Sequence, residues 1–165
     1  MIGHGFSRAA ALATAVGVFA LDRWSKWMVL THLGPDDVKQ VIPGFFNIVH
    51  SENPGIAFGM FADGSGAWHT PVLVVFSIIA VGILAAMLWK IDRLDRSSAV
   101  GLSLIFGGAM GNLFDRVRVG SVTDFLDFYV RSYHWYCFNV ADSGVCIGAG
   151  LLMLSMFLTR PEAKA

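Results

Sequence analysis

The aspartates in the C-terminal third of the chain have the spacing to do acid–base chemistry. Asp124 and Asp127 occur in the stretch VTDFLDF, and Asp142 follows Asn139 by three positions in FNVADS. Two carboxyl groups held together in a site of low dielectric constant cannot easily both ionise, so they share one proton. Such a pair offers one acid and one base at neutral pH, which is what the attack of water on an amide requires.

The same aspartates also have a simpler interpretation. Asp142 stands at the start of an apolar run that continues to Thr159, and an acid in the first turn of a helix interacts favourably with the helix dipole. Asp124 would then be an exposed loop acid. Spacing alone leaves both interpretations open, and it does not choose between Asp124 and Asp127.

The chain around these residues has the composition of a membrane protein. Of its 165 residues, 55% are hydrophobic and 15% are charged, with a mean hydropathy of +0.61. Soluble domains carry about 25% charged residues. A helix needs about 20 mostly apolar residues to cross the hydrocarbon core of a bilayer. The segments that meet this requirement lie at about 9–30, 70–89, 98–114 and 138–159.

The first of these segments also resembles a cleaved signal peptide, because Arg8 precedes a short apolar run with small residues at Ala15 and Ala20. However, the apolar character resumes at Trp27, and no polar linker follows Ala20. The pattern therefore favours an uncleaved helix.

Residues 36–66 are the least helical part of the chain, with proline and glycine around short β-rich runs such as FFNIVH. We predict an all-α integral membrane protein of one domain, residues 1–165. It would have four transmembrane helices and a small β-rich cradle between the first two. The cradle would lie at the outer membrane face, where these side chains could meet lipid: Phe45, Phe46, Phe58, Met60 and Phe61.

The distribution of basic residues predicts that both termini are cytoplasmic, because cytoplasmic segments are enriched in Lys and Arg. In that orientation the first outer loop holds only Lys39. The second outer loop holds Arg116, Arg118 and Arg131. The cytoplasmic pieces hold Arg8, Lys90, Arg93, Arg96, Arg160 and Lys164.

Other polar residues fall within the apolar segments, where charges are costly and tend to be paired or functional. Asp22 and Lys26 are four apart with the acid first, which favours a helical ion pair that neutralises both charges. Asn112 and Asp115 share a helical face. Asp115 could form an interfacial ion pair with Arg116 or Arg118, or it could help to position a reaction centre.

Several functional classes are excluded by composition. The formal net charge is zero and there are no basic tracts, so we expect no nucleic-acid partner. The five histidines are scattered, and Cys137 and Cys146 are interpreted as free packing residues. We therefore expect no metal and no organic cofactor.

Five short motifs together resemble the lipoprotein signal peptidase family, also called signal peptidase II. They are DRWSK at 22–26, NPGIAF at 53–58, GNLFDR at 111–116, VTDFLDF at 122–128 and FNVADS at 138–143. The resemblance implies an aspartic protease of the bacterial inner membrane with four transmembrane helices and a periplasmic β-cradle. Such a protease cuts prolipoproteins just before a diacylglyceryl-modified cysteine.

The resemblance also assigns roles by position. It implies Asp124 and Asp142 as the catalytic pair, which settles the choice against Asp127. The positions that match substrate-binding residues are Asn53, Gly55, Asn112, Arg116 and Asn139. The positions that match structural polar residues are Asp22, Lys26 and Asp115. The chain departs from the family pattern at Pro54 and Thr123, which leaves the carboxylates intact but makes the backbone near Pro54 uncertain.

We accordingly expect diacylglyceryl-modified prolipoproteins and membrane lipid as partners, a monomer, and an active site near the periplasmic face. The stretch Asn53–Phe58 is expected to close over the site as a lid. Two other functions remain open on the sequence. In a proton carrier, the acids would be spread through the depth of the bilayer. A scaffold protein would not need the carboxylate of Asp142 for its function.

Overall fold

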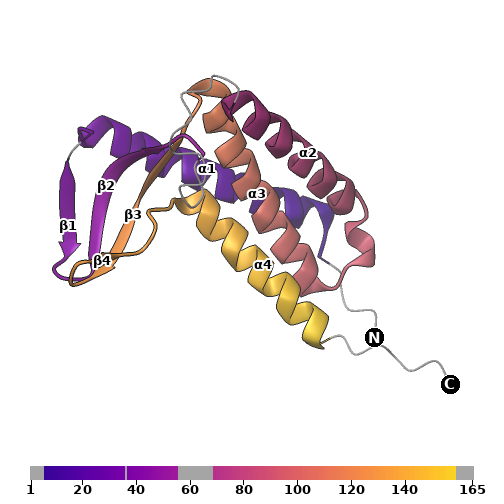
Figure 1. The fold of residues 1–165 in the computed structure, drawn as a ribbon. Coiled ribbons are helices and arrows are strands. Elements are labelled where there is room, and N and C mark those ends of the chain that lie inside the picture. The colour runs from indigo at the N-terminus through magenta and orange to yellow at the C-terminus, as the bar shows by residue number, and fades with distance from the viewer. Residues whose placement is uncertain (1–5, 36, 56–68, 159–165) are drawn as a thin grey trace.

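The computed structural model describes residues 6–35, 37–55 and 69–158. The helices are α1 (Arg8–His32), α2 (His69–Trp89), α3 (Arg96–Arg118) and α4 (Val140–Leu158), with a 3-10 turn η2 (Ile91–Arg93). The strands are β1 (Val38–Ile42), β2 (Phe46–Asn53), β3 (Val122–Val130) and β4 (Tyr133–His134). Figure 1 shows the strands gathered at one end of the helices, next to the start of α4.

Helix α3 is the centre of the helical layer, because it packs against α1, α2 and α4. Its glycines face both neighbours. A Cβ on Gly107 would lie 2.5 Å from the carbonyl oxygen of Ala15 in α1, and one on Gly101 would lie 2.7 Å from that of Gly148 in α4. Small residues of this kind let helix backbones approach closely in a membrane.

Among the described residues, three helices are long and apolar enough to cross a membrane, namely the segment Thr70–Trp89, α3 and α4. No residue in the most apolar part of α2 is buried inside the protein, as expected of a helix that faces lipid. Helix α1 has the predicted position but carries Asp22, Arg23 and Lys26, so its composition alone does not mark it as a span.

The starts of α1 and α3 are fixed by side-chain caps. Ser7 Oγ accepts a hydrogen bond from the backbone N–H of Ala10 at the start of α1, and Asp95 accepts one from Ser98 at the start of α3. The hydroxyl of Ser155 also donates to Asp95 Oδ2 at 2.7 Å, which joins the start of α3 to the end of α4. Helix α3 is longer than the predicted 98–114 and includes Asp115 and Arg116.

The sheet is antiparallel in the order β1-β2-β3-β4. Strands β1 and β2 lie in the predicted β-rich segment, but β3 and β4 come from the connection between α3 and α4, which we expected to be a loop. Strand β3 covers the edge of β2, with Asn47 opposite Asp127 and Asn53 opposite Val122. Asp124 is therefore a strand residue.

The aromatic residues of the cradle have different environments. Phe45 is exposed, whereas Phe46 is half-buried and stacks on Phe128 with ring centroids 4.6 Å apart. The predictions for Phe58, Met60 and Phe61, and most of the predicted lid, lie outside the described residues.

Candidate active site

Asp124 and Asp142 come from different elements and share one neighbour, Asn139. The Asn139 side chain donates to Asp124 Oδ1 at 2.7 Å, and its backbone N–H donates to Asp142 Oδ2 at 3.2 Å. Asp124 is 3% exposed and Asn139 is completely buried. The structure thus brings together the two carboxylates that the sequence analysis paired.

Asp142 is positioned by the start of α4. Asn139 precedes the helix, and its Oδ1 accepts from the backbone N–H of Asp142 at 2.9 Å while the Asp142 carboxylate accepts from the backbone N–H of Asn139. This reciprocal pair is a capping box. The simpler interpretation of Asp142 as a helix-terminal acid is therefore also correct, and the cap holds the carboxylate in one orientation.

Asp124 is positioned by the sheet. It lies on β3 beside the end of β2, and Asn53 of β2 donates to its Oδ2 at 3.0 Å. Burial raises the pKa of Asp124 to about 6, with the hydrogen bond from Asn53 lowering it and the negative charge of Asp142 raising it further. The carboxyl group therefore takes up a proton more readily than an exposed aspartate.

Asp127 is placed differently. Side chains alternate along a strand, so Asp127 and Asp124 point to opposite faces of β3. Asp127 instead accepts a hydrogen bond from Asn47 at 3.0 Å and lies 2.8 Å from the ring of His134. Asp127 therefore has hydrogen-bond partners of its own on the other face of the strand.

Asn112 joins the pair from α3. Its side-chain amide donates to Asp142 Oδ1 at 2.7 Å, and its carbonyl oxygen accepts from Asn139 at 3.2 Å. Each of the four carboxylate oxygens therefore accepts one N–H group. Because a carboxylate has about four lone-pair positions, both groups keep the capacity to bind a water or a substrate.

Arg116 lies one helical turn after Asn112 and interacts electrostatically with Asp142 and Asp124. Its Nε atom is buried and has no hydrogen-bond partner within the described part of the chain. A buried donor without a partner is costly, so this group is suited to receive an acceptor from a ligand.

Gly55 lies near the Asp124 side of the site. Its φ is +99°, a conformation that favours glycine, and its backbone N–H donates to Asn53 Oδ1 at 2.9 Å. A Cβ at this position would collide with the side chain of Leu73 in α2. The turn at Gly55 therefore fixes the Asn53 amide while it faces Asp124.

Asp22, Lys26 and Asp115 form a buried ionic cluster next to the site. The Lys26 ammonium lies 2.8 Å from Asp22 Oδ2 and 2.6 Å from Asp115 Oδ2, and Arg23 also pairs with Asp115. The predicted Asp22–Lys26 pair is thus present. The predicted pairing of Asp115 with Arg116 or Arg118 is replaced by Lys26 and Arg23, because α1 packs against this face of α3.

Sequence reasoning did not find the contacts of this cluster with the site. Lys26 also donates to Asn112 at 3.1 Å, and Asp22 accepts from the backbone N–H of Ala141 at 2.9 Å. Both contacts join residues that are far apart in the sequence. The only sequence signal for them is that charged residues in an apolar helix need partners.

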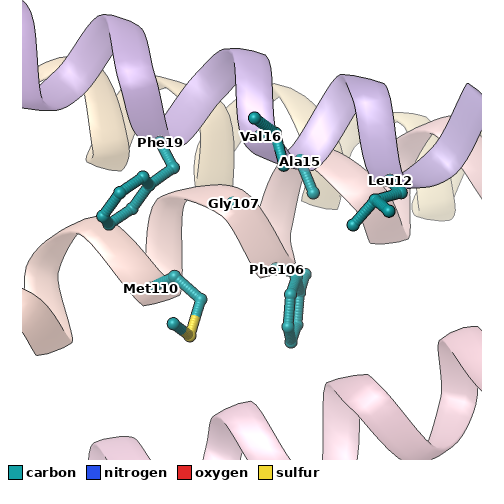
Figure 2. A pocket seen from close by; sticks show the side chains of 7 residues that line it. All are labelled: Leu12, Ala15, Val16, Phe19, Phe106, Gly107 and Met110. Carbon is teal, nitrogen blue, oxygen red and sulfur yellow. The ribbon is translucent and has the colours of Figure 1, made fainter.

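The described residues also bear on metal binding and on cavities away from the carboxylates. Within the described ranges, no group of three or more His, Cys, Asp or Glu is placed to hold a metal ion. A cavity of about 160 Å³ between α1 and α3 is apolar throughout, and Figure 2 shows side chains such as Phe19, Phe106 and Met110 around it. In a membrane, such a surface is suited to lipid chains.

Residues 14–158 match the family model described as signal peptidase (SPase) II. A lipoprotein signal peptidase of Solibacter usitatus is 54% identical over 155 residues, which cover 94% of this chain and 93% of that protein. One of Geobacter sulfurreducens is 40% identical over 144 residues, covering 87% and 89%.

Two solved structures of bacterial membrane enzymes have the same fold. The first, obtained by the in meso method at 2.3 Å, has a TM-score of 0.82 and 31% identity and covers 95% of this chain and 93% of that one. The second, at 1.9 Å, has a TM-score of 0.81 and 30% identity, with coverages of 92% and 95%.

Proposed function

Because this chain belongs to the signal peptidase II family, we propose that it removes signal peptides from prolipoproteins as an aspartic endopeptidase. The cut would fall just before the diacylglyceryl-modified cysteine. The observation that carries the proposal is the pairing of Asp124 and Asp142 through Asn139.

In the proposed mechanism the two carboxyl groups share one proton and hold a water between them. The ionised partner takes a proton from the water as its oxygen adds to the scissile carbonyl carbon. The protonated partner donates to the carbonyl oxygen, giving a tetrahedral intermediate. When this collapses, the carbon–nitrogen bond breaks and the amine leaves with a proton from the carboxyl that took one from water. The other carboxylate takes back a proton from a hydroxyl of the intermediate as the new carboxyl group forms. The raised pKa of Asp124, about 6, supports proton sharing near neutral pH.

The asparagines would position the carboxylates. In the substrate-free chain, the amide groups of Asn53, Asn112 and Asn139 all donate to Asp124 or Asp142. Such fixed donors hold the pair in one geometry, so that little reorganisation is needed during the reaction.

Arg116 would then be the main contact for the substrate backbone. Its unpaired Nε–H lies beside the carboxylates, where it could donate to a peptide carbonyl group that has left water.

We further propose that all four helices cross the inner membrane, with the sheet on the periplasmic side and both termini in the cytoplasm. The charges of α1 are compatible with a span because Asp22 and Lys26 are completely buried and neutralise each other. The acids of α3 and α4, Asp115 and Asp142, lie near the sheet rather than through the depth of the bilayer, which favours a peptidase over a proton carrier.

The test replaces each carboxylate by its amide. Asp124→Asn and Asp142→Asn should each lower kcat by roughly 10²–10⁴-fold on a purified, lipidated prolipoprotein, because each change removes a general acid or base. Asp127→Asn is the matched control, since Asp127 is a buried acid of the same strand that faces away from the site. It should cut at close to the wild-type rate.

Wild-type rates in either Asp124→Asn or Asp142→Asn, at equal folded protein, would rule out the pair. A prolipoprotein without diacylglycerol serves as the second substrate, and equal cleavage of both forms would rule out recognition of the lipid.

A further inference from the structure

Lys26 is a buried cation that pairs with two carboxylates and also contacts a neutral amide oxygen. Its side chain is completely inaccessible. Besides its contacts with Asp22 Oδ2 and Asp115 Oδ2, its ammonium donates to the side-chain carbonyl oxygen of Asn112 at 3.1 Å. The ammonium donates hydrogen bonds to Asp22 and Asn112, whereas its contact with Asp115 is an ion pair without a hydrogen bond. The hydrogen bond to Asn112 connects the ionic cluster to the candidate active site.

Asn112 carries this connection to Asp142. Its carbonyl oxygen faces Lys26 and its amide group faces Asp142 Oδ1, at 2.7 Å. Rotation of the amide by half a turn would direct N–H groups at an ammonium and an oxygen at a carboxylate. Both contacts would then be repulsive, and hydrogen bonds to charged groups are the strong ones. The ammonium therefore favours the one orientation in which Asn112 donates to Asp142.

Asn139 also donates to the Asn112 oxygen, at 3.2 Å, but this amide has a second and shorter hydrogen bond to Asp124. Lys26 is the charged donor of the two, and its own position is fixed by the two carboxylates. The orientation of Asn112 thus depends mainly on a residue that touches neither Asp124 nor Asp142 through a hydrogen bond.

The partner of Lys26 acts on the same part of α4. Asp22 Oδ1 accepts from the backbone N–H of Ala141, the residue before Asp142, at 2.9 Å. Helix α3 comes close enough for this contact because residue 111 is glycine, where a Cβ would lie 2.6 Å from Asp22 Oδ2. The Asp22–Lys26 pair therefore contacts both Asn112, which donates to Asp142, and the backbone of Ala141, which precedes Asp142.

We propose that Lys26 is a positioning residue for the Asp124–Asp142 pair and acts by fixing the side-chain orientation of Asn112. This rests on the proposed peptidase function. It differs from a purely structural role, in which Lys26 only neutralises Asp22 and Asp115 and any loss of activity reflects loss of folded protein.

The test is a double-mutant cycle on kcat with a lipidated prolipoprotein. Lys26→Met keeps the length of the side chain and removes its charge, while Asn112→Ala removes the group through which Lys26 acts. Because Lys26→Met alone leaves Asp22 buried without a cation, the cycle is built in an Asp22→Asn background, where Lys26→Met leaves only the neutral Asp115–Arg23 pair.

In that background, Lys26→Met should lower kcat about 10- to 100-fold with KM little changed, since the loss is in carboxylate geometry. When Asn112 is already alanine, Lys26→Met should have almost no further effect on kcat, because coupled residues are not additive. Thermal unfolding in detergent is measured for every variant, so that kcat refers to folded protein.

Arg23→Met is the matched control. Arg23 pairs with the same Asp115 but has no hydrogen bond to Asn112. It should lower the unfolding temperature while kcat stays within about twofold of the parent.

A second readout does not depend on activity. The side-chain amide resonance of Asn112, assigned by its loss in Asn112→Ala, should shift in Lys26→Met more than in Arg23→Met. Normal kcat in folded Lys26→Met, additive effects of Lys26→Met and Asn112→Ala, or an unshifted resonance would each overturn the positioning role. Failure of the wild-type protein to cut any lipidated prolipoprotein would instead overturn the proposed function, and this inference with it.

Discussion

The hydrogen-bond donors to the two candidate catalytic carboxylates all come from asparagines and not from charged residues. Three of the four N–H groups on their oxygens come from asparagine side chains, and the fourth is the backbone N–H of Asn139. A neutral amide fixes the direction of a carboxylate without contributing a full charge. It therefore perturbs proton sharing less than a hydrogen-bonded lysine or arginine would.

Asn139 combines two roles that substitution can separate. Asn139→Ala removes both the cap of α4 and the hydrogen bond to Asp124, whereas Asn139→Ser keeps a capping oxygen but loses the amide donor. We expect Asn139→Ala to lower stability by about 1 kcal/mol and Asn139→Ser to recover most of this loss. Both variants should have strongly reduced kcat, measured beside thermal unfolding in detergent. Recovery of activity together with stability in Asn139→Ser would show that the cap is the only role of Asn139.

The sequence could identify the candidate acids but not their partners. Asn139 and Asp142 are three residues apart at the start of one helix, so their proximity was predictable from the sequence. The contacts of Lys26 with Asn112 and of Asn53 with Asp124 join different elements, and no local pattern encodes them. The choice of Asp124 over Asp127 needed the family resemblance, because both acids lie in one alternating stretch.

At the scale of elements, α3 packs closely against its neighbours at glycine positions, where a larger residue would clash. Gly107 meets the backbone of Ala15 in α1, and Gly111 meets Asp22. The charged segment of α1 reaches the site only because α3 presents backbone, rather than side chains, at these positions. The packing of α1 on α3 is thus a condition for the ionic cluster.

Gly107→Ala should weaken this packing. The added methyl group would contact the carbonyl of Ala15, and overpacking of this kind costs about 1–3 kcal/mol. Gly17→Ala in α1 is the control, because a Cβ there meets nothing within 4 Å. Thermal unfolding in detergent should therefore show a lower midpoint for Gly107→Ala and no decrease for Gly17→Ala. Equal midpoints would show that α1 can move away from α3 without cost.

The sequence predicted the four long helices correctly but missed the strand β3. The four helices lie close to the predicted segments because each has a sustained apolar run. Strand β3 was expected to be a loop, since its neighbour β2 is more than 60 residues away in the chain and acids interrupt the stretch. Those acids are satisfied by Asn53, Asn139, Asn47 and His134, which only the folded chain brings near.

At the scale of the whole molecule, the sheet and the start of α4 lie at one end of the helices, and the η2 turn and the start of α3 lie at the other (Figure 1). The proposed orientation puts the first end in the periplasm, where a signal peptide emerges from the membrane. It puts the basic residues around η2 in the cytoplasm, in agreement with the distribution of Lys and Arg.

Cysteine labelling tests this orientation. Val38 of β1 and Arg93 of η2 are both exposed, and each can be changed to cysteine in a Cys137→Ala/Cys146→Ala background that retains activity. A membrane-impermeant maleimide added to intact spheroplasts should label Val38→Cys and leave Arg93→Cys unlabelled until the cells are lysed. The reverse pattern would place the sheet in the cytoplasm and exclude the proposed site of cleavage.

The division of the sheet between two distant segments also affects the order in which the protein can mature during translation. Strand β2 is complete at Asn53, but β3 begins only at Val122. A ribosome adding about 5–20 residues per second needs roughly 3–14 seconds for the intervening chain. During that time β2 has an open edge, and two helices must enter the membrane before it is covered. Asp142 is translated last, at the start of α4, so under the proposed mechanism a nascent chain that ends before α4 would lack one carboxylate and could not cut a neighbouring precursor.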